Sequence, residues 1–284
     1  MSNGGIIGPT QSPTFGSETV TTYTSTDTYS NPAAFTTLDI LVVAGGGSAN
    51  VPGSEPGGGG SEGGAGAGGM RQKDSFSVSA STDYAVTVGS GGGDNSSGGA
   101  SQFGGPGNPA PQRIASSGGG RAGGRHQNGI SGGSGGGAGD GATLGPSRTG
   151  GSGNSGGYTP VEGYAGGNGT PASSYEPAGG GGGASAVGGN GGPFGAGLAS
   201  TITGTPIVHS MGGDGEGAPS PYRDGSTPGG YGHGANTDND SSSPAAEKAY
   251  PGVVIVKSGA FSDASGVWQL IDVVEGRKAG TWGG

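Results

Sequence analysis

Alternating apolar and polar positions predict short β-strands on both sides of a long block that has few side chains. In the segment 36–44, Leu38, Ile40 and Val42 share one face, while Leu41 and Val43 share the other. Because both faces are apolar, this strand is expected to be central in its sheet and buried. Further strands are predicted at 18–24, 75–80, 84–89 and 253–256, and weaker ones at 101–103, 113–116, 200–203 and 207–210.

The strands predicted at 75–80 and 84–89 each have one apolar face. Phe76 and Val78 alternate with serines, and Tyr84 and Val86 alternate with small or polar residues. Only residues 81–83 separate the two segments, which is a typical length for a hairpin loop. The sequence therefore predicts that these two strands pair with each other.

The C-terminal tail has a different pattern, with apolar residues at helical spacing and an aromatic residue near each end. This spacing predicts a short amphipathic helix, which ends where glycines follow. We interpret residues 258–284 as an attachment or oligomerisation segment. Its candidate contact residues are Trp268, Leu270, Ile271, Val274 and Trp282.

Glycine changes this picture, because it makes up 77 of the 284 residues and is concentrated between Gly45 and Gly234. Hydrophobic residues are only 28% of the chain, too few for a conventional core of this length. Charged residues are only 11%, which is low for a disordered segment. These values indicate a structure held mainly by backbone hydrogen bonds.

The glycine runs have a period of three residues, which matches the three residues per turn of a polyproline II helix. The period runs from Gly57 to Gly69, and again from Gly180 to Gly195 with one alanine in place of glycine. Without side chains, such polyglycine II helices can approach closely and bond to each other through their backbones. We therefore predict an all-β fold class, a small antiparallel β scaffold with packed polyglycine II helices and a short C-terminal helix.

The sequence has no arrangement of residues that points to catalysis or to a cofactor. Two Gly-x-Ser-x-Gly matches, at 132–136 and 153–157, lack the strand and helix that a nucleophile elbow requires. There is no cysteine and no phosphate-binding Gly-Lys-Ser/Thr motif. The three histidines lack metal-ligand spacing, and calcium near Asp140 or Asp214 stays open as a stabilising alternative. We expect no enzyme activity, no cofactor and no bound metal.

Net charge and hydropathy also limit the partners. The formal net charge of -9 argues against nucleic acid. No apolar run approaches the roughly 20 residues needed to span a bilayer, so membrane insertion is not expected.

Irregular inserts interrupt the glycine runs and contain most of the tyrosine, arginine and histidine. Exposed tyrosine is a common anchor at recognition surfaces, and a basic cluster can contact an anionic sugar. Covering the edge of the glycine structure is an equally good interpretation of the tyrosines, and a solvated loop is the simpler one for the basic cluster. The candidate receptor-binding residues are Tyr158, Tyr164, Tyr175, Tyr222, Tyr231, Arg121, Arg125 and His126.

Three motifs, in order, resemble the glycine-rich domain of tailed-phage fibre and virion proteins. They are LVVAGGG at 41–47, YAVTVGSGGG at 84–93 and PGVVIVK at 251–257. The two ends of the chain resemble those of structural proteins from phages of marine bacteria. The resemblance implies a virion component, and in similar tip adhesins polyglycine II helices form a sandwich whose loops contact the host receptor. It also implies a homotrimer.

We therefore expect a phage virion structural protein, assembled in the host cytoplasm, that recognises the host cell as a tail-fibre or appendage tip subunit. Its expected partners are other virion proteins and a host surface glycan or outer-membrane protein. The alternative is a capsid decoration or fibre-shaft protein with a purely structural role. The expected organisation is an arm at 1–17, a glycine-rich domain at 18–257 and the attachment segment at 258–284.

Overall fold

A computed structural model of the protein describes most of the glycine-rich region and its flanking strands. The predicted arm, the predicted C-terminal helix, Tyr175 and Tyr222 lie outside the described residues. The described residues are 18–33, 35–49, 62–139, 148–170, 178–215, 230–237 and 249–259.

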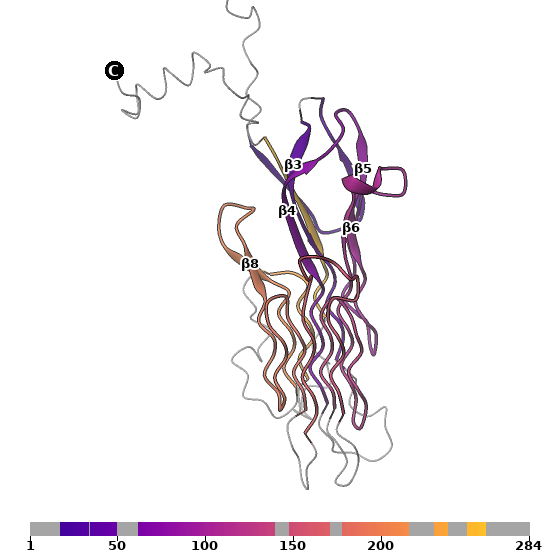
Figure 1. Cartoon of the computed structure of the whole chain (residues 1–284), viewed down its shortest axis with the longest axis vertical. Helices are drawn as coiled ribbons and strands as arrows, with labels where there is room; N and C mark the ends of the chain where they lie inside the picture. The colour runs from indigo at the N-terminus through magenta and orange to yellow at the C-terminus, as the bar shows by residue number, and fades with distance from the viewer. Residues whose placement is uncertain are drawn as a thin grey trace, which may run out of the picture.

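Two antiparallel sheets form a sandwich at one end of the molecule, and a slab of extended glycine-rich segments continues from it (Figure 1). The first sheet has the order β1 (Thr19–Tyr23), β10 (Val253–Ser258), β3 (Thr37–Val43), β4 (Met70–Ser77). The second has the order β2 (Asp27–Ser30), β5 (Asp83–Thr87), β6 (Ser101–Phe103), β7 (Ile114–Ser116). A separate ribbon pairs β8 (Leu198–Ser200) with β9 (Ile207–His209), and a single 3₁₀ turn, η1, spans Ala110–Gln112.

The core between the two sheets contains the apolar faces that the alternation predicted. Leu38, Ile40 and Val42 of β3 pack here, while Leu41 and Val43 belong to a second cluster on the other side of the strand. β3 lies between β10 and β4, so its predicted central position is confirmed.

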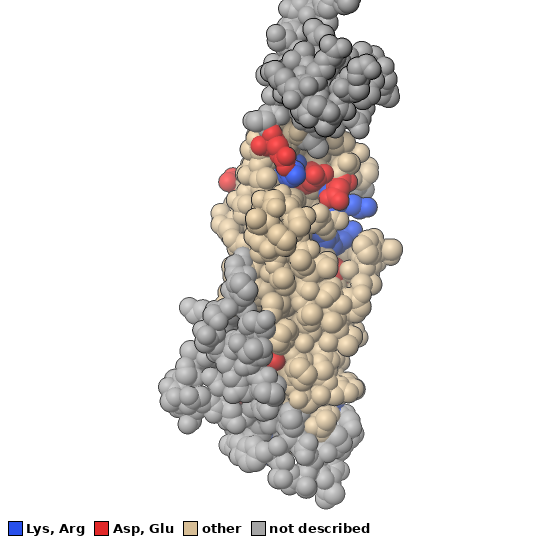
Figure 2. Space-filling view, turned by 90° about the vertical axis from the view of Figure 1, so that its left-hand side faces the viewer, with Lys and Arg blue, Asp and Glu red and all other residues tan. Residues whose placement is uncertain are grey.

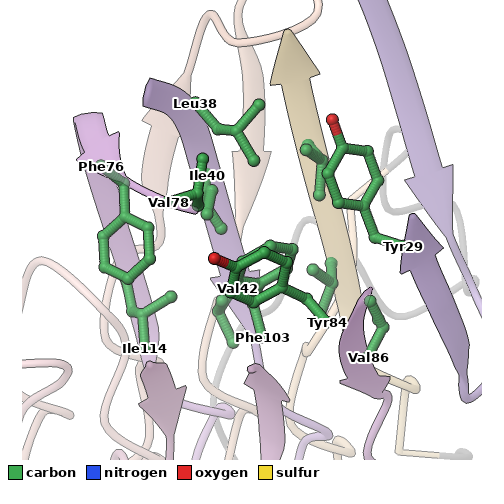
Figure 3. Packing of buried hydrophobic residues seen from close by; sticks show 12 residues of the cluster. Tyr29, Leu38, Ile40, Val42, Phe76, Val78, Tyr84, Val86, Phe103 and Ile114 are labelled. Carbon is green, nitrogen blue, oxygen red and sulfur yellow. The ribbon is translucent and has the colours of Figure 1, made fainter. Parts of the chain in front are cut away.

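Aromatic rings from both sheets meet in this core (Figure 3). Phe103 stacks on Tyr84 at a centroid distance of 5.0 Å and meets Phe76 edge-on at 6.2 Å. Phe76 comes from β4 of the first sheet, whereas Tyr84 and Phe103 come from the second. The rings therefore join the two sheets.

The predicted pairing of the strands at 75–80 and 84–89 is wrong. β4 pairs with β3 in the first sheet, whereas β5 pairs with β2 and β6 in the second. Residues 78–82 therefore connect the two sheets instead of closing a hairpin. The physical reason is that both apolar faces point into the same core from opposite sides, and a hairpin would place them side by side in one sheet.

Below the sandwich, successive residues of each glycine-rich segment bond to different neighbouring segments. In 62–69, Gly63, Gly66 and Gly69 donate their N–H groups to the carbonyls of Gly123, Gly120 and Ser117. Gly64 and Ala67 donate to Gly179 and Gly182, and Ala65 and Gly68 donate to Ala235 and Gly232. The bond direction thus repeats every third residue, as a three-fold polyglycine II helix requires. This confirms the predicted three-residue period for the part from Gly63 to Gly69.

The segment 62–69 is completely enclosed by other segments of the slab. Through N–H and C=O bonds together it contacts six of them, which is the full shell of a hexagonal array. The six neighbours are 44–49, 117–123, 133–139, 178–184, 209–215 and 230–237.

The predicted second run, from Gly180 to Gly195, is not a single helix. Gly180 and Gly183 donate to the carbonyls of Gly189 and Ala186, so the chain folds back on itself between them. It reverses again at Gly191 and Gly192, whose φ angles are 77° and 120°. Regular glycine spacing does not distinguish one long helix from adjacent short ones, because both need a side without side chains where a neighbouring segment packs.

Candidate recognition surface

The domain has two distinct ends. Thr19 pairs with Ser258 at the end of the sandwich that lies away from the slab, whereas Tyr23 and Val43 lie next to the slab. The chain therefore enters and leaves the domain at the sandwich end. Segments of the slab run away from the sandwich and end in turns (Figure 1). One of these segments starts at Ser117, which bonds to Gly69 next to β4, and runs past Gly123 to the turn at 125–126.

The predicted basic cluster is spread along one slab segment and the turn that follows it. Arg121 lies within the segment 117–124, and its Nη1 atom donates to Oδ1 of Asn95 in a neighbouring turn at 2.7 Å. Arg125 and His126 form the turn at the end of this segment, where His126 adopts a φ of 57°. All three side chains of the cluster are partly exposed.

Tyr158 lies at the opposite end of the slab, where it meets the sandwich. The guanidinium of Arg71 in β4 sits 4.0 Å from the centroid of its ring. The Nη1 atom of Arg71 also donates to the carbonyl of Ala115 in β7. The structure therefore does not bring Tyr158 together with the basic cluster, and Tyr158 contributes to a junction between slab and sandwich.

Glu162 is the centre of this junction and was not singled out by the sequence. Its carboxylate is completely buried and accepts the N–H groups of Ser117 at 2.7 Å and Gly156 at 3.0 Å. It occupies the space beside Gly69, where a Cβ atom would lie 2.4 Å from Oε2. No spacing rule marks this glutamate, because its partners are backbone N–H groups and Ser117 is 45 residues away in the sequence.

We expect Glu162→Gln to lower the free energy of unfolding by about 1–3 kcal/mol. The reason is that the NH₂ group of the glutamine would face one of the two buried backbone N–H groups, so that two donors meet without an acceptor. Urea unfolding at neutral pH measures this. Glu18→Gln is the control, since Glu18 is more than half exposed and pairs with Lys257 at the surface. That change is expected to cost less than about 1 kcal/mol. Equal losses for the two variants would contradict the junction role of Glu162.

Tyr164 and Tyr231 occupy two further environments. Tyr164 is 38% exposed on the side of the slab. Tyr231 packs against the second apolar cluster and stacks on the imidazole of His209, with centroids 6.0 Å apart. Among the predicted tyrosines within the described residues, Tyr158 and Tyr231 are only partly exposed, and Tyr164 is the exposed one.

Two buried histidines join the segments 207–215 and 230–237 reciprocally. The Nδ1 atom of His209 accepts the N–H of Tyr231, and the Nδ1 atom of His233 accepts the N–H of Met211. Their exposures are only 1% and 2%, and burial lowers the pKa of each imidazole to about 4. We call this pair the histidine clasp. As both imidazoles are neutral acceptors, it is a structural feature that the sequence did not reveal.

Asparagine side chains complete the hydrogen bonding at the slab's outer segments. The Oδ1 atom of Asn128 accepts the backbone N–H of Thr149. In the same way, Oδ1 of Asn168 accepts the N–H of Gly150, and Oδ1 of Asn190 accepts the N–H of Asn168. All three asparagines are exposed. A usable sequence signal was present, because non-glycine residues three positions apart inside a glycine run share one face of a polyglycine II helix.

The described part of the chain has neither a metal-binding group nor a membrane span. Among these residues, no three His, Cys, Asp or Glu side chains gather as metal ligands. The same residues include no helix with the length and apolar character to cross a bilayer.

Comparison with known proteins agrees with the glycine-rich architecture. A family model described as a glycine-rich domain matches residues 19–259. The chain belongs to this glycine-rich domain family. The match covers both sheets and the slab that continues from them. A search of curated proteins found no match.

Proposed function

We propose that this glycine-rich domain protein is a structural component of a tailed-phage virion, and that it recognises the host cell surface as a tail-fibre or appendage tip subunit. The proposal has no catalytic role for the protein. Its partners would be other virion proteins and a glycan or outer-membrane protein of the host, and it would assemble as a trimer.

The observation that carries the proposal is the separation of the two ends. The chain enters and leaves beside the Thr19–Ser258 pair, so connections to further segments belong at the sandwich end. Turns with varied polar side chains, including Arg125 and His126, lie at the other end of a hydrogen-bonded slab. A rigid body attached at one end and presenting turns at the other is suited to contact a surface at a distance.

Adsorption blocking tests this function. Purified protein, preincubated with host cells, is expected to reduce phage adsorption in a concentration-dependent manner. Arg125→Glu at the far end is expected to weaken the blocking about tenfold, because it reverses a charge at the proposed contact. Arg113→Glu is the matched control, since Arg113 is exposed beside η1 at the sandwich end.

Complete failure of the folded protein to block adsorption would contradict receptor recognition. Electron microscopy of virions labelled at this protein distinguishes the adhesin from the purely structural alternative. A label on the fibre shaft or on the capsid would favour the structural alternative. A label at the tip of a fibre supports the adhesin.

A further inference from the structure

We infer that one side of the slab is a binding face for a neutral, hydroxyl-rich glycan, with the amide groups of Asn168 and Asn190 and the side chain of Val187 as its main contacts. The inference rests on the proposed function, because it identifies the chemical class of the surface ligand. It differs in location, because the contact lies on the side of the slab and not at the far end.

The face is flat because of how its segments are packed. The segment 164–170 bonds to 148–153 on one side and to 186–190 on the other. Its remaining neighbours, 133–139 and 178–184, lie behind it. In a hexagonal array, four consecutive neighbours leave two adjacent sides open, so the three outer segments lie in one plane.

Side chains project from this plane at regular intervals. Positions three residues apart lie on the same side of a polyglycine II helix, about 9 Å apart along its axis. Hydrogen-bonded neighbouring chains are about 5 Å apart. The outward residues form two rows, Ser152, Ala165 and Val187 in the row nearer the sandwich and Thr149, Asn168 and Asn190 in the other.

The two asparagines are held in one orientation by the slab. Each Oδ1 atom accepts a backbone N–H, at 3.0 Å for Asn168 and 2.7 Å for Asn190. An amide whose oxygen is engaged toward the protein keeps its two N–H donors for another acceptor. Within the described residues neither Nδ2 atom donates to a protein group, and both residues are exposed. The face therefore presents fixed donors on adjacent segments.

The composition of the face favours a neutral ligand with many hydroxyl oxygens. None of the six outward residues is charged, and the nearest charge in sequence is Arg148. On the side drawn in Figure 2, charged side chains likewise gather over the sandwich and the described slab is almost free of them. Val187, in the row nearer the sandwich and 59% exposed, supplies apolar area for the C–H face of a sugar ring. The spacing of neighbouring segments is comparable to the repeat of a pyranose along a polysaccharide.

The experiment measures binding of the purified protein to an array of immobilised neutral oligosaccharides, with acidic glycans on the same surface as comparators. We expect weak binding to neutral glycans, strengthened by immobilised density. Asn168→Asp and Asn190→Asp keep an oxygen that accepts the slab's N–H but remove the outward donors. Each is expected to weaken binding about tenfold.

Asn108→Asp is the matched control, with the same change of charge beside η1 at the sandwich, where Oδ1 accepts the N–H of Gly105. It is expected to bind as the wild type does. Absence of binding to any neutral glycan, binding confined to acidic glycans, or equal binding by Asn168→Asp and Asn108→Asp would overturn the inference.

The adsorption assay distinguishes this inference from the proposed function. Blocking of adsorption that survives Asn168→Asp would leave the adhesin proposal intact and refute the glycan face as its contact. Neutral-glycan binding without any blocking of adsorption would support the face and contradict the adhesin.

Discussion

Gly66→Ala is expected to lower the free energy of unfolding by at least about 3 kcal/mol, because it forces a methyl group into backbone of the slab. A Cβ atom at Gly66 would lie 2.3 Å from the carbonyl oxygen of Ser134 and 2.6 Å from the carbonyl carbon of Gly135. Backbone atoms cannot rotate away as a side chain can. Any shift also strains the bonds that Gly66 makes with Gly120 and Gly47. For a domain of this size we expect a fall in the unfolding temperature of about 10 °C.

Gly93→Ala is the matched control for this prediction. A Cβ atom at Gly93 meets nothing within 4 Å, and its φ does not lie in the left-handed region. Alanine there is expected to be neutral or to stabilise by up to about 1 kcal/mol, because it restricts the unfolded chain. Circular dichroism during heating and urea unfolding measure both variants. A Gly66→Ala protein within about 0.5 kcal/mol of the wild type would contradict close packing of the slab.

The strands and the three-residue glycine period could be predicted from the sequence, because both depend on a local pattern. The two faces of β3 separated Leu38 from Leu41 as the alternation indicated, and the Gly63, Gly66 and Gly69 repeat corresponds to one edge of one helix. β2 was missed, because only Tyr29 in it points into the core.

The partners of each glycine segment could not be predicted, because a residue without a side chain carries no signal of its neighbour. Ala65 illustrates this: its methyl packs with Ala49, Ala122 and Ala235 in a small cluster inside the slab. Ala65 and its three partners come from four different segments, and nothing in their local sequence relates them. The junction at Glu162 was missed for a similar reason, since its partners are backbone N–H groups.

Acid is expected to destabilise the protein through the histidine clasp. Each imidazole has a pKa near 6.5 when unfolded and about 4 when folded, with burial as the main cause. The folded state therefore binds fewer protons than the unfolded state between these values. Stability from each histidine is complete above about pH 6.5 and is lost as the pH falls toward 4. A shift of this size corresponds to about 3 kcal/mol per histidine.

The loss is expected to be specific, because protonation of Nδ1 removes the acceptor that holds the opposite segment. His209 and His233 would lose the N–H bonds of Tyr231 and Met211, and the two imidazolium charges would repel each other. The groups around them, Tyr231 and Tyr250, are aromatic rings that offer no compensating negative charge at acid pH.

The measurement is urea unfolding of the wild type and of a His209→Asn, His233→Asn double variant between pH 8 and pH 4.5. The asparagine Oδ1 can replace Nδ1 as acceptor, but the double variant does not titrate at these two positions. It should lose about 4 kcal/mol less than the wild type when the pH falls from 8 to 5. Parallel pH profiles for the two proteins would show that the histidines are already solvated or charged in the folded state, and would refute the clasp as the source of acid sensitivity.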